Sequence, residues 1–158
     1  MRALPRHSSI ALGYAVEFIL AALIFLVIWK CGQLKKLILF IDVSASSWAT
    51  FFGIMLTGAK AARLIFFGIN STDFSAWLEW KKVGSVFATA FLFNVLLFLV
   101  ATVVFIILIF VKSTWFTNVG AFLWCLGLIN SFTFPLLINS FVRLHAQFNL
   151  EFKKATKG

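Results

Sequence analysis

The chain has 158 residues, of which 62% are hydrophobic and 12% are charged, and its mean hydropathy is +1.02. Soluble domains carry roughly 25% charged residues, so this composition excludes an ordinary soluble fold. The net charge is +9, but the basic residues stand in short clusters between apolar runs. That distribution indicates contact with lipid headgroups rather than nucleic-acid binding. We therefore predict an all-α integral membrane protein that needs no cofactor.

Four apolar stretches are long enough to cross a bilayer, since about twenty helical residues span the roughly 30 Å hydrocarbon core. Their predicted ranges are 10–29, 37–58, 85–111 and 120–142. The last two form a hairpin, because Lys112 is the one charged residue between Lys82 and Arg143. We expect residues 1–158 to form a single domain, a bundle of four transmembrane helices joined by short loops.

Two further segments lie outside the predicted spans. In residues 70–82, Asp73 can cap a short helix rich in tryptophan, a composition suited to the membrane interface. Residues 143–158 are expected to extend the fourth helix into the cytosol, where Phe148 and Phe152 share one face for docking on a neighbour. Within the fourth span, Pro135 removes a backbone donor and predicts a kink.

The distribution of basic residues predicts the orientation. With four spans, the N-terminus, the middle loop and the C-terminus share one side, which then carries ten basic residues: Arg2, Arg6, Lys60, Arg63, Lys81, Lys82, Arg143, Lys153, Lys154 and Lys157. The other side carries Lys30, Lys35, Lys36 and Lys112. By the positive-inside rule both termini are cytoplasmic. A bacterial inner membrane is the predicted location, and an organelle membrane is the alternative, because the N-terminus is arginine-containing and free of acids.

Glu17 is the most costly residue of the predicted spans, because a charged side chain near the bilayer centre costs at least about 2.5–3.5 kcal/mol. Lys60 or Arg63 could reach toward it from the second span. Polar residues of the other spans fall at similar depth: Thr50, Asn94, Asn130 and Thr133. Such a layer has two interpretations, a path or binding site for protons, ions or a ligand, or hydrogen bonding that fixes helix packing. Asp42 is expected to be an interfacial partner of Lys35 or Lys36.

The second span carries small side chains at four-residue spacing: Ala49, Gly53, Thr57 and Ala61. Small residues in this pattern let helix backbones approach closely, within one chain or between two copies. Either arrangement fits the sequence.

The sequence contains no motif for catalysis or metal binding. His7 and His145 have no acid or cysteine at ligand spacing, and no nucleophile–base pair stands out. We predict a non-catalytic protein that is an oligomeric subunit, anchor or regulator of a larger membrane complex, with lipids and other membrane or cytosolic subunits as its partners. The alternatives are a small ion or proton channel or membrane-perturbing protein centred on Glu17, and an immunity or exclusion factor acting on a foreign protein at the membrane.

Overall fold

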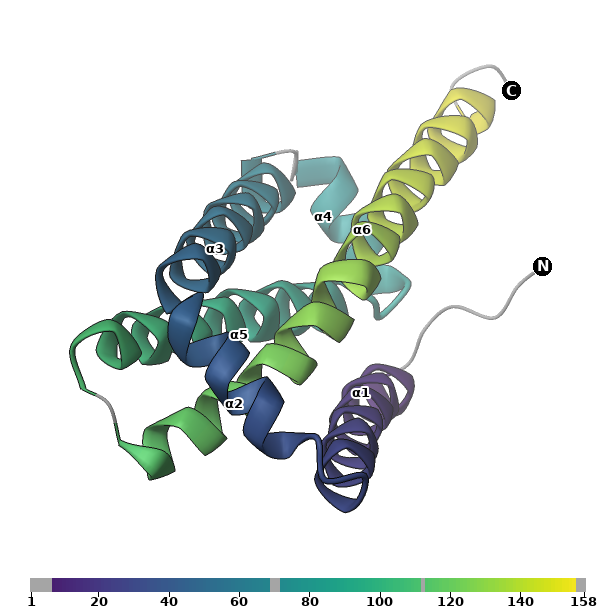
Figure 1. The fold of residues 1–158 in the computed structure, drawn as a ribbon. Helices are drawn as coiled ribbons and strands as arrows, with labels where there is room; N and C mark the ends of the chain where they lie inside the picture. Colours follow the sequence, from purple (N-terminus) through teal and green to yellow (C-terminus); the bar gives the residue numbers. More distant parts are fainter. Residues whose placement is uncertain (1–6, 69–71, 112, 156–158) are drawn as a thin grey trace.

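The computed structural model describes residues 7–68, 72–111 and 113–155. This part of the chain contains six helices and no strand (Figure 1): α1 (His7–Lys30), α2 (Leu34–Val43), α3 (Ala45–Gly68), α4 (Thr72–Trp80), α5 (Gly84–Phe110) and α6 (Thr114–Ala155). Four of them, α1, α3, α5 and α6, are long and apolar enough to cross a membrane. The predicted all-α bundle with four spanning helices is confirmed.

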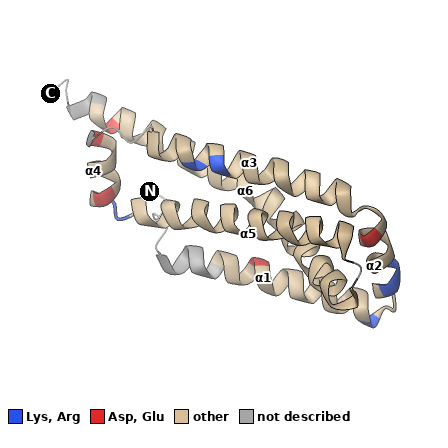
Figure 2. Ribbon diagram, turned by 90° about the vertical axis from the view of Figure 1, so that its left-hand side faces the viewer, with Lys and Arg blue, Asp and Glu red and all other residues tan. Residues whose placement is uncertain are grey.

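The two short helices lie at opposite ends of the bundle (Figure 2). α2 joins α1 to α3 at one end, and α4 joins α3 to α5 at the other. The start of α1 and the end of α6 both lie at the end that carries α4. Most charged residues gather toward these ends, whereas α1 carries Glu17, and α3 carries Lys60 and Arg63, part-way along their lengths. Which side of the membrane each end faces stays a prediction.

The second spanning helix differs from its predicted range of 37–58. The apolar stretch is interrupted at Ser44, and the spanning helix that follows is α3. The hydroxyl of Ser44 donates to the carbonyl of Phe40 and accepts the indole N–H of Trp48 at 2.9 Å, so it satisfies backbone and side-chain groups at the break. Lys60 and Arg63, predicted to follow the span, lie inside α3. The Arg63 guanidinium stands over the Phe67 ring at 5.6 Å.

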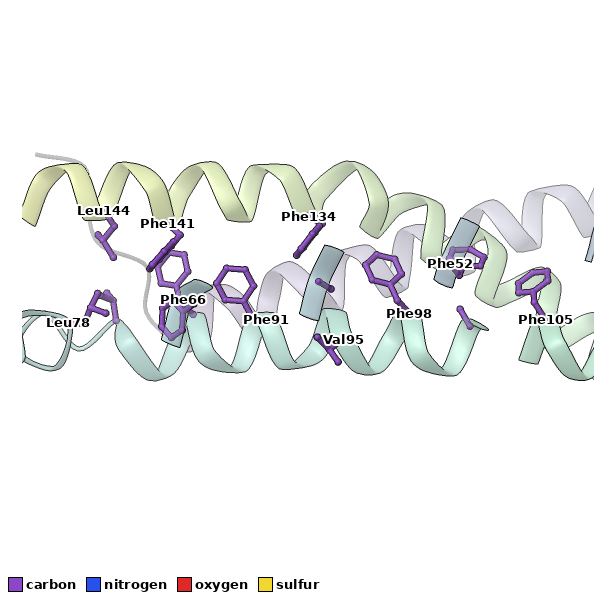
Figure 3. Packing of buried hydrophobic residues seen from close by; sticks show 14 of the residues in the cluster. Phe52, Phe66, Leu78, Phe91, Val95, Phe98, Phe105, Phe134, Phe141 and Leu144 are labelled. Carbon is purple, nitrogen blue, oxygen red and sulfur yellow. The ribbon is translucent and has the colours of Figure 1, made fainter. Parts of the chain in front are cut away.

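The core consists of aromatic rings from α3, α5 and α6 (Figure 3). Buried residues recur every seven positions on α3 and at alternating four- and three-residue steps on α5, the spacing of helices that pack at a shallow angle. They are Ala45, Phe52, Ala59 and Phe66 on α3, and Phe87, Phe91, Asn94, Phe98, Ala101, Phe105 and Leu108 on α5. Phe66 lies 4.9 Å from Phe141 of α6 between ring centroids. These rings pack α3, α5 and α6 together along one continuous core.

In contrast, α1 is peripheral. Only Ala21 is buried among its residues from Gly13 onward. The helix contacts α6 more than α5, and its Phe18 and Phe25 both pack edge-on against Phe122 of α6. The polar side chains of α1 are therefore held on the flank of the core and not inside it.

The C-terminal part of α6 packs on α4. α6 continues without interruption through Pro135 to Ala155. Beyond the end of the bundle, Phe148 lies 5.1 Å from Phe74 and 5.8 Å from Trp77, between ring centroids. The Trp77 indole N–H donates to Glu151 Oε2 at 2.8 Å. We call Phe74, Trp77 and Phe148 the α4–α6 aromatic cluster.

Candidate functional site

A pocket of about 180 Å³ opens between α1, α5 and α6. We call it the Glu17 pocket. Its lining combines polar with apolar side chains: Gly13, Tyr14, Glu17, Ala90, Asn94, Thr133, Phe134 and Leu137. Three residues of the predicted polar layer thus meet in one place: Glu17, Asn94 and Thr133.

Helical spacing explains why these residues share the pocket. Tyr14 and Glu17 are three positions apart on α1, and residues at this spacing lie on the same helix face. Ala90 and Asn94 of α5 are four positions apart. Asn94 lies ten residues after the first residue of α5, so at 1.5 Å per residue it is roughly 15 Å along the helix. The pocket is therefore inside the spanning region, nearer the end that carries α4.

Tyr14 connects α1 to α5 through hydrogen bonds. Its hydroxyl donates to the carbonyl of Ala90 at 2.9 Å and accepts from the Asn94 amide Nδ2 at 3.1 Å. The same Nδ2 also donates to the Ala90 carbonyl at 3.0 Å. The Tyr14 ring packs on Phe93, with centroids 4.0 Å apart. This network fixes the position of Tyr14 and uses both amide hydrogens of Asn94.

The side-chain atoms of the pocket that are not used in the hydrogen bonds above are acceptors. Asn94 is 2% exposed, and its Oδ1 has no hydrogen-bond partner. Glu17 Oε2 is also buried without a partner. The Thr133 hydroxyl donates to the Asn130 carbonyl at 3.3 Å, so its own lone pairs are what it can offer to the pocket. Buried acceptors without partners are costly, and they call for a donor.

No protein cation neutralises Glu17 in the described part of the chain, where its carboxylate makes no ion pair. Neither of the basic residues expected to reach it, Lys60 and Arg63, lines the pocket. Arg63 is engaged with Phe67, and Lys60 is exposed on α3. Both are on a helix that packs mainly against α5, whereas Glu17 is on α1.

Two predicted members of the polar layer lie elsewhere. Asn130 is fully buried and donates to the Leu126 carbonyl at 3.2 Å, but it does not line the pocket. Thr50 is exposed on α3, where its hydroxyl donates to the Ser46 carbonyl at 3.0 Å.

Asp42 is on α2, and it lines a cavity with Lys35 at the opposite end of the bundle from α4. That Asp42 is an interfacial partner of Lys35 or Lys36 stays a prediction.

The small residues of α3 have two environments. Ala49 packs against the core, and a Cβ on Gly53 would lie 4.0 Å from the Thr102 side chain of α5. Thr57 and Ala61 are exposed. The first half of the stripe therefore packs inside the chain, and the second half faces outward.

Three of the predicted basic residues lie at the α4 end. Lys81 Nζ stands 4.3 Å from the centroid of the Trp80 ring and 3.6 Å from Glu151 Oε2. Lys82 adopts a left-handed backbone conformation, with φ of 57°, between α4 and α5. Arg143 is exposed on α6. Three acids lie at the same end, Asp73 and Glu79 on α4 and Glu151 on α6, so the charges of the described side chains balance there.

Tyr14 was missed in the sequence analysis, although it makes the central hydrogen bonds of the pocket. A tyrosine near the start of a span resembles an interfacial anchor. The available signal was its three-residue spacing from Glu17, which places the phenol and the carboxylate on one helix face.

Among the described residues, no three His, Cys, Asp or Glu side chains come together as a metal site would require. Comparison with known proteins finds no matching protein family, curated protein or solved structure. The fold defines a polytopic helical membrane protein, and the pocket gives it an acidic site within the spanning region.

Proposed function

We propose that this protein is a non-catalytic subunit or regulator of a larger membrane complex, and that α3 is the helix that contacts a partner. The observation that carries the proposal is the composition of the exposed side of α3. Its small exposed residues are Ser46, Ser47, Thr50, Thr57, Gly58 and Ala61, and the large apolar residues Ile54, Leu64 and Ile65 are exposed beside them. We call the six small residues the outward face of α3.

The outward side of α5 provides the comparison within the same molecule. From Leu92 onward, every exposed residue of α5 is a large apolar one: Leu92, Leu96, Leu99, Val100, Val103, Ile106, Ile109 and Phe110. Such side chains suit contact with lipid tails. Small and hydroxyl-bearing residues are instead enriched where membrane helices pack, because they let two backbones approach closely.

The hydroxyls of the outward face are compatible with a close helix contact. Thr57 donates to the Gly53 carbonyl at 3.0 Å, as Thr50 does to that of Ser46. Both donors are thus satisfied within α3, and the side chains stay close to the helix surface. A Cβ on Gly58 would meet nothing within 4 Å, so the space beside it is open to a partner.

The test fills this space with larger side chains. Gly58→Leu and Ala61→Leu should each weaken association by about tenfold or more, since overpacking a contact costs about 1–3 kcal/mol. The matched control is Val103→Leu, which adds bulk to the exposed side of α5. Mass measurement of the protein purified in mild detergent separates a second copy of this chain from a different subunit.

A wild-type protein that behaves as a lone monomer, with nothing co-purifying, would reject the proposal. The same holds if Gly58→Leu, Ala61→Leu and Val103→Leu leave the assembly equally intact. Loss of assembly in the α3 variants alone supports it.

A second candidate function, a small ion or proton pathway, is favoured by the Glu17 pocket. An ionisable group inside a spanning region commonly marks such a path. Proton flux into liposomes containing the purified protein should then fall in Glu17→Gln. Flux that is absent, or unchanged by this substitution, removes the candidate and leaves the assembly proposal untouched, because the α3 variants do not alter the pocket.

A further inference from the structure

We propose that the Glu17 pocket binds a small organic cation, a primary ammonium group carried on a short apolar chain. This inference does not depend on assembly through α3. It concerns what occupies the pocket, whether or not ions are conducted.

The first argument comes from hydrogen-bond donors and acceptors. Tyr14 and Asn94 use their donors on each other and on the Ala90 carbonyl, and Thr133 donates to Asn130. The Asn94 amide cannot be turned over without setting its oxygen against the Ala90 carbonyl, so Oδ1 is the atom left without a partner. Glu17 Oε2 also has no partner, and both Glu17 and Asn94 line the pocket. A primary ammonium supplies three donors and no acceptor.

The second argument is electrostatic. Glu17 is half-buried, and one of its two carboxylate oxygens, Oε2, is buried without a partner. The described residues provide no basic partner for it, and a carboxylate inside a membrane span without a counter-charge is costly. A cationic ligand supplies the missing charge. A hydrogen bond to a charged group stabilises a complex by about 1.5–3 kcal/mol, roughly a tenfold to hundredfold gain in affinity.

The third argument concerns size and the remaining walls of the pocket. A cavity of about 180 Å³ is smaller than the roughly 300–1,000 Å³ of sites for drug-sized ligands. Ala90, Phe134 and Leu137 give part of its wall an apolar lining. A short alkyl chain fits this wall, whereas a bare inorganic ion would leave it unused.

This ammonium chemistry has two possible sources, a free alkylamine and the headgroup of an ethanolamine phospholipid. The first arm of the experiment titrates n-butylammonium chloride into the full-length protein in detergent and follows the heat of binding. The second incubates the protein with phosphatidylethanolamine or phosphatidylcholine and detects retained lipid by native mass spectrometry.

Two variants remove the site in different ways. Glu17→Gln takes away the charge, and Gly13→Leu fills the space, since a Cβ on Gly13 would meet nothing within 4 Å. Each should weaken binding by at least about tenfold. The controls are Glu79→Gln, an exposed acid on α4, and Gly68→Leu, a second helical glycine with open space around it. Both controls should bind as the wild type does.

Binding of n-butylammonium that is lost in both pocket variants supports a free amine. Selective retention of phosphatidylethanolamine with the same variant pattern supports the lipid. The inference is overturned if neither probe binds, if butan-1-ol binds as tightly as n-butylammonium, if sodium competes at equal concentration, or if Glu17→Gln binds like the wild type.

Discussion

A single glycine of α6 determines how closely that helix approaches the core. A Cβ on Gly127 would overlap the ring of Phe52, which is fully buried between Phe98 and Phe105. Because the ring has no space into which to move, Gly127→Ala should destabilise the bundle by about 1–3 kcal/mol. Unfolding of the purified protein in mixed micelles by added dodecyl sulfate measures this change.

The matched control makes the same substitution where space is open. Gly58→Ala on α3 should stabilise the protein by about 0.5–1 kcal/mol, because alanine is the better residue in a helix interior. The change in the free energy of unfolding should therefore have opposite signs for Gly127→Ala and Gly58→Ala. A stabilising effect of Gly127→Ala would show that α6 does not lie this close to Phe52.

At the residue scale, the sequence predicted how deep a polar residue lies in its span, but not the direction in which its side chain points. Counting along each span placed Glu17, Asn94 and Thr133 at similar depth, and the structure brings these three into one pocket. Depth alone could not show that Asn130 and Thr50 lie outside the pocket. Which neighbour a side chain faces also depends on the rotation of its helix about its own axis. That rotation is determined by the aromatic core, which links residues far apart in the sequence.

At the scale of elements, apolar length predicted the spanning helices better than it predicted their ends. The third range, 85–111, agrees closely with α5 (Gly84–Phe110). The second range, 37–58, differs from α3 at both ends. Lys60 lies inside the helix, which continues to Gly68, and no proline or glycine in the sequence marks the break at Ser44. A long cationic side chain is compatible with a helix interior where its charged end can reach the interface.

The α4–α6 aromatic cluster gives the next prediction. Phe148→Ala removes a ring that contacts both Phe74 and Trp77, so α4 should separate from α6. Truncating a buried phenylalanine costs about 3–5 kcal/mol, here concentrated at one end of the molecule. Hydrogen exchange should accelerate in residues 73–80 and 143–152 and stay slow in α5.

Leu150→Ala is the control for that experiment, because Leu150 is exposed on the same part of α6. Its exchange pattern should match the wild type. Equal protection of α4 in Phe148→Ala would mean that the membrane surface, and not α6, holds α4 in place.

At the scale of the whole molecule, the bundle combines a buried aromatic core with a peripheral first helix. Rings from α3, α5 and α6 interlock along the core, whereas α1 buries Ala21 and adds the hydrogen bonds of Tyr14. The proposed ammonium site lies on the boundary between these two parts. A ligand that binds Glu17 and Asn94 together would therefore tie α1 to α5.

The orientation of the bundle gives the last prediction, and the native cysteines make it testable. Cys31 is exposed at the end of α1 that adjoins α2, and Cys125 is buried in α6. The positive-inside rule predicts that the end carrying α4 is cytoplasmic, so that Cys31 faces the opposite side. A membrane-impermeant maleimide should then label Cys31 in intact cells. The double variant Cys31→Ser/Ala146→Cys should react only after permeabilisation, because Ala146 is exposed on the part of α6 at the α4 end. The reverse pattern would place the termini outside and make the α2 end cytoplasmic.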